Sequence, residues 1–571
     1  MNKVKSTVRA WHMGGCALSI LAAAVAGHAS AQAVEHNNPV VPPGKTVLVA
    51  PPNMVPASQD ATPLGTNLKG IVILGATDAV HTGAGTGLDL GSGNRLQNDS
   101  RARTELGHFI GQPLSRRLIA EVQATIARAY RRQGFPFVSL STPEQDVTSG
   151  VLQIRVVEFV AGNITVHGAA SSAEAQHVAG AVRQKSGEPI NADLLNQDLA
   201  WLNHYPFHQV QAVFSPGNSL GVSDLSLNET EAKNWTIYGG YNNAGSPSTG
   251  LNRYFAGASV GNLLGADSVL SYQGTSGDGR VNGHGRYISN AVNYTLPVGR
   301  GQVEASLDQV ETNQSVTPFA VRLTDVEGSA GYRFTLSGFP GDRAQSDVRA
   351  GVEIKHEAAK TFFVGTDVYD ASMNVDQLYL GYHRAAFDSM GMSDLDLVLH
   401  ANPGSGESKA AVMAYSLGRM KSNTYGYLGL TYNRTTNLPG RITLNTMAVG
   451  QLAGAPLPRS EQAGLGGAYL VRGYSLDDGA YDTAFVLRNE LRPAPGAYGT
   501  GPVNPFVFVD IGYGRDNYTK LSHSLASAGV GASVYLTGHV ALNFDVARPL
   551  QNAPVTRSGD WKLDTSLSLR F

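Results

Sequence analysis

The chain ends with WKLDTSLSLRF at residues 561–571, a stretch in which two kinds of side chain alternate. The odd-numbered positions are mostly apolar or aromatic, whereas the even-numbered positions are polar or charged. Side chains along a strand point alternately to its two faces, so this stretch predicts a strand with one apolar and one polar face. A barrel strand between lipid and water needs this pattern, and the last strand of a soluble sandwich is the alternative.

The end of this strand carries a second signal. Leu567, Leu569 and Phe571 share the apolar face, and the chain stops on an aromatic residue. Such an ending resembles the recognition signal of outer-membrane barrels. The resemblance implies the barrel assembly machinery and outer-membrane lipid as partners.

The start of the chain predicts export from the cytoplasm. A basic segment at 1–9 precedes an uncharged apolar run at 14–27 and the small residues Ala29-Ser30-Ala31. This is the pattern of a secretory signal peptide covering residues 1–31, with cleavage after Ala33 as the second choice. The sole cysteine, Cys16, lies inside that peptide, so disulfides and cysteine-ligated metal sites are excluded from the mature chain.

Composition narrows the class of protein further. Only 15% of the residues are charged, against an average of about 25%. No stretch after the signal approaches the ~18 consecutive apolar residues of a spanning helix. The formal net charge of −2 gives no reason to expect a nucleic-acid partner.

The mature chain divides into three parts. Residues 32–66 contain seven prolines without helical periodicity and predict an extended linker. Residues 67–158 and 159–232 each predict a small β-α-α-β-β unit. Helices are expected at 114–132, 173–184 and 192–202, and strands at 71–74, 137–140, 151–157, 163–166, 209–214 and 224–227.

The third part, residues 235–571, consists of short alternating segments separated by glycine, asparagine, aspartate and proline. Sixteen such segments predict an antiparallel transmembrane β-barrel, because closure removes the edges that lipid does not tolerate. Residues 410–420 are either a further strand or a helix in a loop. The segments are 235–241, 254–260, 268–273, 287–294, 303–310, 328–334, 347–354, 377–382, 395–399, 425–432, 442–449, 483–491, 506–513, 526–535, 540–546 and 562–571.

Four short motifs occur in order along these parts. The barrel contains Val471-Arg472-Gly473-Tyr474 and then Phe508-x-Asp510-x-Gly512. The two small domains contain Pro143-x-Gln145-Asp146 and Pro216-Gly217-x-x-x-Gly221-x-Ser223-Asp224. Together they resemble the two-partner secretion transporters (TpsB), the haemolysin and haemagglutinin secretion/activation proteins of the BamA-like superfamily.

This resemblance implies two periplasmic POTRA domains and a 16-stranded barrel in the outer membrane of a Gram-negative bacterium. It also implies that a loop at about 455–481 folds into the lumen, where Arg472 pairs with Asp510. Such a transporter would capture a large unfolded exoprotein, an adhesin, haemagglutinin or haemolysin, and secrete it. Many members plug the pore with an N-terminal helix, but the prolines of 32–66 disfavour such a helix in this chain.

The alternation of side chains in the strand at 506–513 gives a separate argument for a pair between Arg472 and Asp510. Its apolar residues Val507, Val509, Ile511 and Tyr513 should face lipid. Phe508, Asp510 and Gly512 then face inward, since a carboxylate facing lipid would cost several kcal/mol. The alternative is that Arg472 and Asp510 are separate, solvated charges of the lumen.

Other functions are less well supported by the sequence. A BamA-like assembly factor normally carries more small domains, and a diffusion porin has no reason to carry any. Residues 217–221 match the hydrolase signature G-x-S-x-G, but an alternating strand follows where that motif requires a helix. His356, His383 and His400 stand isolated on or beside strands. We therefore predict neither an enzyme nor a metal or cofactor site.

Overall fold

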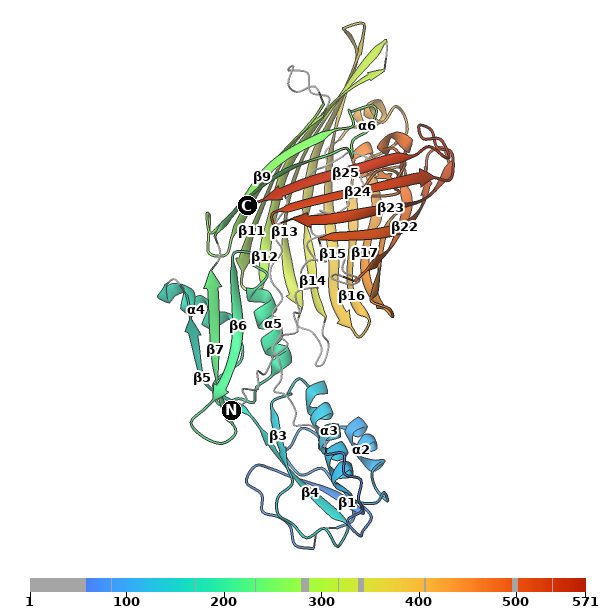
Figure 1. Cartoon of the computed structure of the whole chain (residues 1–571). Coiled ribbons are helices and arrows are strands. Elements are labelled where there is room, and N and C mark those ends of the chain that lie inside the picture. Colours follow the sequence, from blue (N-terminus) through green and yellow to red (C-terminus); the bar gives the residue numbers. More distant parts are fainter. Residues whose placement is uncertain are drawn as a thin grey trace, which may run out of the picture. The chain divides into compact units, whose positions relative to one another are not determined.

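The computed structural model describes residue 39 and residues 58–571, apart from 84, 170, 232, 279–286, 317, 337–343, 405–406, 495–501 and 537. The predicted signal peptide and most of the linker lie outside the described residues. The described residues from 58 onward form two compact units, an N-terminal unit up to residue 231 and a C-terminal unit from residue 233 (Figure 1). Each unit is described by itself.

The first domain of the N-terminal unit is a four-stranded sheet with two helices. Its strands lie in the order β2-β1-β4-β3, with β1 parallel to β4. Both helices have side-chain caps, from Asp99 for α2 and from Ser115 for α3. The elements are β1 (Gly70–Leu74), β2 (Gly87–Asp89), α2 (Ser100–Gly107), α3 (Arg116–Arg132), β3 (Val138–Ser141) and β4 (Val151–Glu158).

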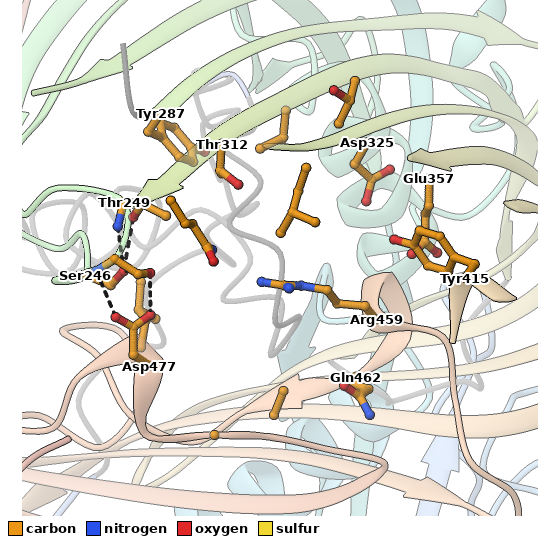
Figure 2. A pocket seen from close by; sticks show the side chains of 18 residues that line it. Ser246, Thr249, Tyr287, Thr312, Asp325, Glu357, Tyr415, Arg459, Gln462 and Asp477 are labelled. Carbon is orange, nitrogen blue, oxygen red and sulfur yellow. Dashed lines mark hydrogen bonds between the residues drawn. The ribbon is translucent and has the colours of Figure 1, made fainter. Parts of the chain in front are cut away.

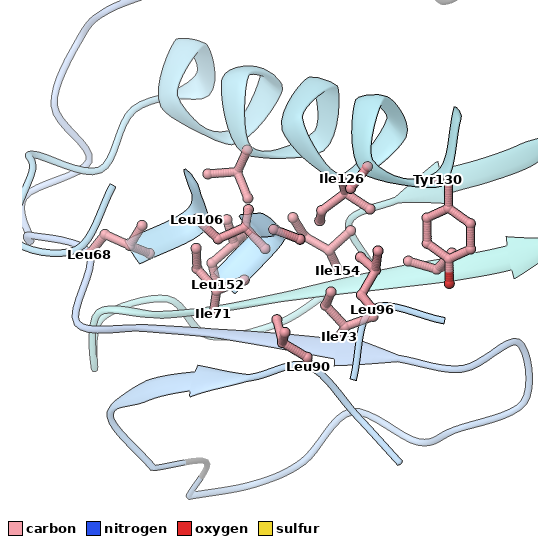
Figure 3. Packing of buried hydrophobic residues seen from close by; sticks show 14 of the residues in the cluster. Leu68, Ile71, Ile73, Leu90, Leu96, Leu106, Ile126, Tyr130, Leu152 and Ile154 are labelled. Carbon is pink, nitrogen blue, oxygen red and sulfur yellow. The ribbon is translucent and has the colours of Figure 1, made fainter. Parts of the chain in front are cut away.

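The core of this domain lies between the sheet and the helices (Figure 3). Ile126 and Tyr130, one turn apart on α3, pack with Ile73 of β1 and Ile154 of β4. All four side chains are almost completely buried. The apolar stripe of α3 is thus the surface that holds the helix on the sheet.

The second domain has the predicted β-α-α-β-β order, with its sheet in the order β5-β7-β6. In the first domain the sequence prediction missed β2 and α2. Only Ala102 and Leu106 of α2 are buried, so this polar helix carries little apolar periodicity. The second-domain elements are β5 (Val160–His167), α4 (Ser172–Ala181), α5 (Ala192–Leu202), β6 (His208–Pro216) and β7 (Val222–Glu231).

Part of the predicted linker packs on the first domain. The Leu64 N–H donates to the Leu114 carbonyl at 2.8 Å, and the Leu114 N–H donates to the Thr66 carbonyl at 2.9 Å. The Asp60 carbonyl accepts from the Arg117 N–H at 2.9 Å. The first domain therefore begins before residue 67, the predicted boundary.

The C-terminal unit is a closed antiparallel barrel of 16 strands, as predicted. Each predicted segment corresponds to one strand. Residues 410–420, left open between strand and helix, contain helix α6 (Lys409–Tyr415). The strands are β8 (Trp235–Asn242), β9 (Arg253–Gly261), β10 (Val269–Gly277), β11 (Tyr287–Val298), β12 (Gly301–Val316), β13 (Phe319–Leu336), β14 (Gln345–Phe363), β15 (Thr366–Asp388), β16 (Gly391–Pro403), β17 (Thr424–Leu438), β18 (Ile442–Ala453), β21 (Thr483–Pro493), β22 (Val503–Arg515), β23 (Ser522–Leu536), β24 (Val540–Pro549) and β25 (Lys562–Arg570).

The barrel closes between its first and last strands. Residues 566–570 of β25 pair with residues 238–242 of β8. Phe571 continues this ladder, because its N–H donates to the Ile237 carbonyl at 2.9 Å and its main-chain oxygen accepts from the Ile237 N–H at 3.1 Å. Its exposed ring stacks on His539, with centroids 5.8 Å apart. Among the helices of the described residues, none is long and apolar enough to cross a membrane.

Deletion of Phe571 is expected to impair barrel assembly, because it removes two backbone hydrogen bonds at the closing seam together with the terminal aromatic ring. The amount of heat-modifiable barrel in outer-membrane fractions measures this effect. Phe571→Tyr, which retains both features, is the control and should assemble normally. Wild-type levels of heat-modifiable barrel after the deletion would contradict the assembly role of the terminus.

Candidate functional site in the barrel lumen

The segment between β18 and β21, residues 454–482, folds against the inner wall of the barrel and is called the lumen loop below. It contains two short 3-10 helices, η2 (Arg459–Glu461) and η3 (Leu476–Asp478). A two-residue pair, β19 (Ala463–Gly464) with β20 (Ala480–Tyr481), brings the two arms of the loop together. The predicted limits of 455–481 agree closely with this segment.

The lumen loop has an apolar core of its own. Leu465, Val471 and Tyr474 of the loop are completely buried. They belong to one cluster with Val486 of β21 and Leu525 of β23. Apolar burial therefore holds the loop against this part of the wall, independently of its charged contacts.

Arg472 at the tip of the loop forms the ion pair expected with Asp510 of β22. Its Nε lies 2.7 Å from Asp510 Oδ2, and its Nη2 lies 2.8 Å from Oδ1. Nη1 also donates to Glu490 of β21 at 2.7 Å. The guanidinium lies over the Phe508 ring, 3.5 Å from its centroid. Arg472 and Asp510 are 1% and 0% exposed, so the pair is screened from bulk water.

The facing predicted for β22 agrees with these contacts. Val507, Val509, Ile511 and Tyr513 in its central part are exposed, and the residues between them are buried. Phe508 and Asp510 thus reach the loop from one face of the strand. A bidentate carboxylate contact together with a stacked ring uses properties that lysine lacks.

The glycines of both barrel motifs lie at close approaches. A Cβ on Gly512 would lie 2.8 Å from Val471 Cγ2 of the loop. Gly473 has φ of +85°, which favours glycine, and a Cβ there would lie 3.0 Å from Ala547 Cβ. Larger residues at these positions would displace the loop from the wall.

Tyr474, the last residue of the tip motif, ties the loop to the C-terminal strands. Its hydroxyl donates to the Ala526 carbonyl at 2.9 Å and accepts from the Gln551 N–H at 3.1 Å. Its carbonyl accepts from Lys562 Nζ at 3.2 Å. The polar face of β25 therefore points into the barrel, as its alternation predicted.

Asp478 was missed by the sequence reasoning. Its carboxylate accepts hydrogen bonds from the N–H groups of Ser475, Val555 and Thr556, at 2.8, 2.8 and 2.9 Å. It thereby closes a capping box on η3 and joins the loop to the connection between β24 and β25. The Ser-x-x-Asp spacing at 475–478 was the available sequence signal.

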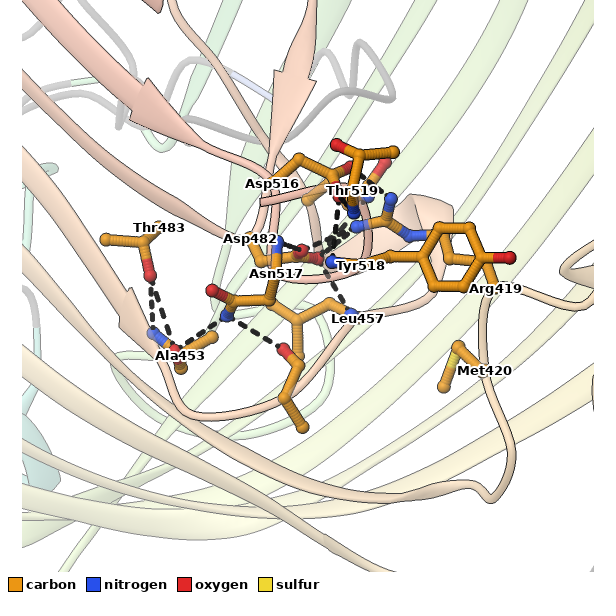
Figure 4. A network of polar contacts seen from close by, with 12 residues as sticks. Arg419, Met420, Ala453, Leu457, Asp482, Thr483, Asp516, Asn517, Tyr518 and Thr519 are labelled. Atoms are coloured by element: carbon orange, nitrogen blue, oxygen red, sulfur yellow. Dashed lines mark hydrogen bonds and ion pairs between the residues drawn. The ribbon is translucent and has the colours of Figure 1, made fainter. Parts of the chain in front are cut away.

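Asp482 at the end of the loop is the centre of a polar network (Figure 4). It accepts from Arg419 Nη2 at 2.6 Å and from the N–H groups of Leu457 and Asn517, at 2.8 and 2.6 Å. Arg419 also pairs with Asp516. The network thus ties both arms of the lumen loop to the connection between β22 and β23 and to the segment after α6.

The loop leaves a cavity of about 480 Å³ on the side of β11–β14 (Figure 2). Thr312, Asp325 and Glu357 line it from the barrel wall, and Arg459 extends into it from the lumen loop. Thirteen of the 18 lining residues carry a hydroxyl, amide or charged group, which suits a hydrated passage better than an apolar ligand.

The motif residues of the small domains close turns within these domains. Gln145 Nε2 donates to the Gln153 carbonyl of β4 at 2.7 Å and to the Pro143 carbonyl at 3.2 Å. Asp146 accepts from the Thr148 N–H at 2.9 Å, and hydrogen bonds from Thr148 lower the pKa of this carboxyl. These contacts stabilise the connection between β3 and β4.

The second motif of the small domains occupies the turn between β6 and β7. The Gly217 N–H donates to the Val222 carbonyl at 3.0 Å, and Gly221 has φ of +81°. Asp224 accepts from the Asn163 N–H of β5 at 2.7 Å. Pro216 ends β6. Strand β7 thus follows the G-x-S-x-G sequence directly.

Two histidines predicted to be isolated have carboxylate neighbours. His383 lies 3.0 Å from Asp347 and 2.8 Å from Asp394, and His400 lies 3.3 Å from Glu353. Period-two alternation placed them on strands but could not identify neighbours across the sheet. No group of three or more histidine, cysteine, aspartate or glutamate residues in the described part of the chain is arranged to hold a metal ion.

Comparison with known families identifies two matches. Residues 221–534 match the family described as haemolysin secretion/activation protein ShlB/FhaC/HecB. Residues 87–158, within the first small domain, match the ShlB-type POTRA domain.

Curated relatives match over most of their length. The heme/hemopexin transporter protein HuxB of Haemophilus influenzae (strain 86-028NP) is 23% identical over 484 residues, covering 80% of this chain and 82% of the relative. The outer membrane transporter CdiB-2 of Burkholderia pseudomallei (strain 1026b) is 22% identical, covering 75% and 73%. The solved structure of CdiB from Escherichia coli has the same fold, with a TM-score of 0.67 at 20% identity, covering 91% and 94% of the two chains.

Proposed function

The chain belongs to the family of haemolysin secretion/activation proteins ShlB/FhaC/HecB, and from this membership we propose that it captures an unfolded exoprotein in the periplasm and secretes it. The protein is an outer-membrane transporter with N-terminal periplasmic POTRA domains and a 16-stranded barrel. The lumen loop, held in the barrel by the buried Arg472–Asp510 pair, is the observation that carries the proposal. Family membership favours export over BamA-like assembly of other barrels.

The exoprotein would be captured through sheet edges of the small domains. Within the described residues, β6 pairs with β7 alone and β3 pairs with β4 alone. An extended segment adds a strand to such an edge through main-chain hydrogen bonds, which tolerate many sequences. An adhesin, haemagglutinin or haemolysin with a β-rich N-terminal region fits this mode of binding.

Export would use binding and folding free energy, because ATP is not present outside the cytoplasm. The captured chain would thread through the lumen and fold at the cell surface, and folding would bias its movement outward. No step of this sequence needs catalysis, so we propose no enzymatic activity. Membrane lipid around the barrel and the barrel assembly machinery complete the proposed partners.

The capture step predicts that residues 58–232, produced alone, bind the unfolded N-terminal region of the cognate exoprotein. Titration calorimetry measures the interaction, and an unrelated folded protein of similar charge is the control. We expect saturable binding only to the cognate segment. Absence of binding to that segment would remove the capture role from these domains.

A further inference from the structure

The lumen loop has a second charged contact with the wall, through its first 3-10 helix. Glu461, the last residue of η2, is completely buried, and its Oε1 lies 2.7 Å from Lys355 Nζ of β14. The Lys355 side chain is only 1% exposed and also contacts Glu327 of β13 at 3.1 Å. Neither charge of the Lys355–Glu461 pair is therefore open to bulk water.

Neutral groups of the wall complete this contact. The hydroxyl of Tyr427 on β17 donates to Glu461 Oε2 at 2.5 Å, and Gln377 Nε2 on β15 donates to the same oxygen at 3.0 Å. Next to it, the Ser460 hydroxyl donates to Glu357 of β14 at 2.6 Å. Three strands thus satisfy one loop carboxylate, as a buried charge requires.

This contact lies on a different part of the wall from the contacts of Arg472. Lys355 lies on β14 and Asp510 on β22, with five strands between them along the shorter way round the barrel. Tyr427 of β17 and Glu490 of β21, which belong to the two contacts, have only β18 between them. The two contacts also lie in different segments of the loop, η2 and the tip. The loop is therefore held through two of its segments, at two neighbouring parts of the wall.

We propose that Glu461 and Lys355 form a second anchor of the lumen loop, which positions it as a partition across the pore. The apolar core and Arg472 hold the tip of the loop against β21–β23, and the Lys355–Glu461 pair holds its η2 arm against β14. The remaining passage then lies on the side of β11–β14. Moving the loop away from the wall separates the two charges of a buried pair and leaves each without its partner. Each anchor therefore opposes release of the loop from the wall. The proposal deepens the proposed export function and rests on it for its biological role.

Conductance of the purified full chain in planar bilayers tests the anchor without any exoprotein. Lys355→Gln leaves Glu461 buried without its cation, and we expect the ratio of open to closed dwell times to rise roughly tenfold. Glu461→Gln keeps the shape of the side chain and leaves Lys355 paired with Glu327, so a smaller rise is expected. Lys360→Gln on the same strand, which breaks an exposed pair with Asp370, is the matched control and should behave as wild type.

The combination of both anchors makes the test specific. Arg472→Ala with Lys355→Gln should open the pore more than the product of the two single effects, because either anchor alone still holds the loop. Heat-modifiable mobility verifies folding, and Glu461→Gln decides the matter if Lys355→Gln fails to fold. Wild-type dwell times in folded Glu461→Gln and Lys355→Gln would overturn the second anchor. The two functions can fail separately. If the variants open more often but the wild-type protein secretes no exoprotein, the second anchor is supported and the export function is contradicted.

Discussion

Arg472→Ala is expected to reduce secretion of the exoprotein strongly while the barrel still folds. The substitution removes a bidentate pair with Asp510, a contact with Glu490 and a stack on Phe508. Breaking a buried pair costs ~3–5 kcal/mol, and water that enters the space left by the guanidinium lowers this cost. If about 1–2 kcal/mol of stabilisation is lost, the fraction of molecules with a correctly placed loop falls roughly 5–30-fold. Exoprotein in the culture medium, normalised to heat-modifiable barrel, measures the loss.

The partner substitution and the double substitution test whether the residues act together. Asp510→Ala should also reduce secretion, but less than Arg472→Ala, because Glu490 still pairs with Arg472. The double variant should be little worse than Arg472→Ala, since both changes remove one shared interaction. The charge-swapped pair, Arg472→Asp with Asp510→Arg, should recover only partly, because an arginine fork and a carboxylate differ in reach.

Arg434→Ala is the control for this series, because Arg434 forms an ion pair with Asp388, which is 54% exposed. It should secrete as wild type, since exposed ion pairs contribute little. Strictly additive losses in the double variant would show that Arg472 and Asp510 act separately. Unchanged secretion by Arg472→Ala would contradict a role for the loop tip in export.

The number of barrel strands was predictable from the sequence, but their lengths were not. The prediction placed six residues of β15 at 377–382, whereas the strand covers Thr366–Asp388. Only the part of a strand that faces lipid must alternate, so polar ends that extend beyond this region carry no such pattern. Periodicity therefore counts the strands and leaves their ends undetermined.

The candidate site was predictable in part. The inward-facing side of the strand at 506–513 and the family resemblance together predicted that Arg472 pairs with Asp510, and the structure contains that pair. The additional partner Glu490 and the Lys355–Glu461 contact were not anticipated. All charged residues that face the lumen show the same alternation in the sequence. Which of them form pairs depends on strand register and on the path of the 29-residue loop at 454–482. Such long-range pairing has no local signature in a single sequence.

Passage of the exoprotein through the lumen is the central claim, and site-specific photocrosslinking tests it most directly. A photoreactive phenylalanine analogue at Thr312 of β12 would face the cavity beside the lumen loop. The same analogue at Leu307 of β12, which is 57% exposed on the outer face, is the matched control. The exoprotein is stalled during export by a tightly folded domain at its C-terminus.

Illumination of cells that hold this stalled complex gives the decisive result. We predict a covalent adduct between transporter and exoprotein at position 312 and none at position 307. The adduct should require residues 67–232 and should disappear when the exoprotein lacks its N-terminal region. Secretion of the unstalled exoprotein with no adduct at 312, or with equal adducts at 312 and 307, would contradict transport through the lumen.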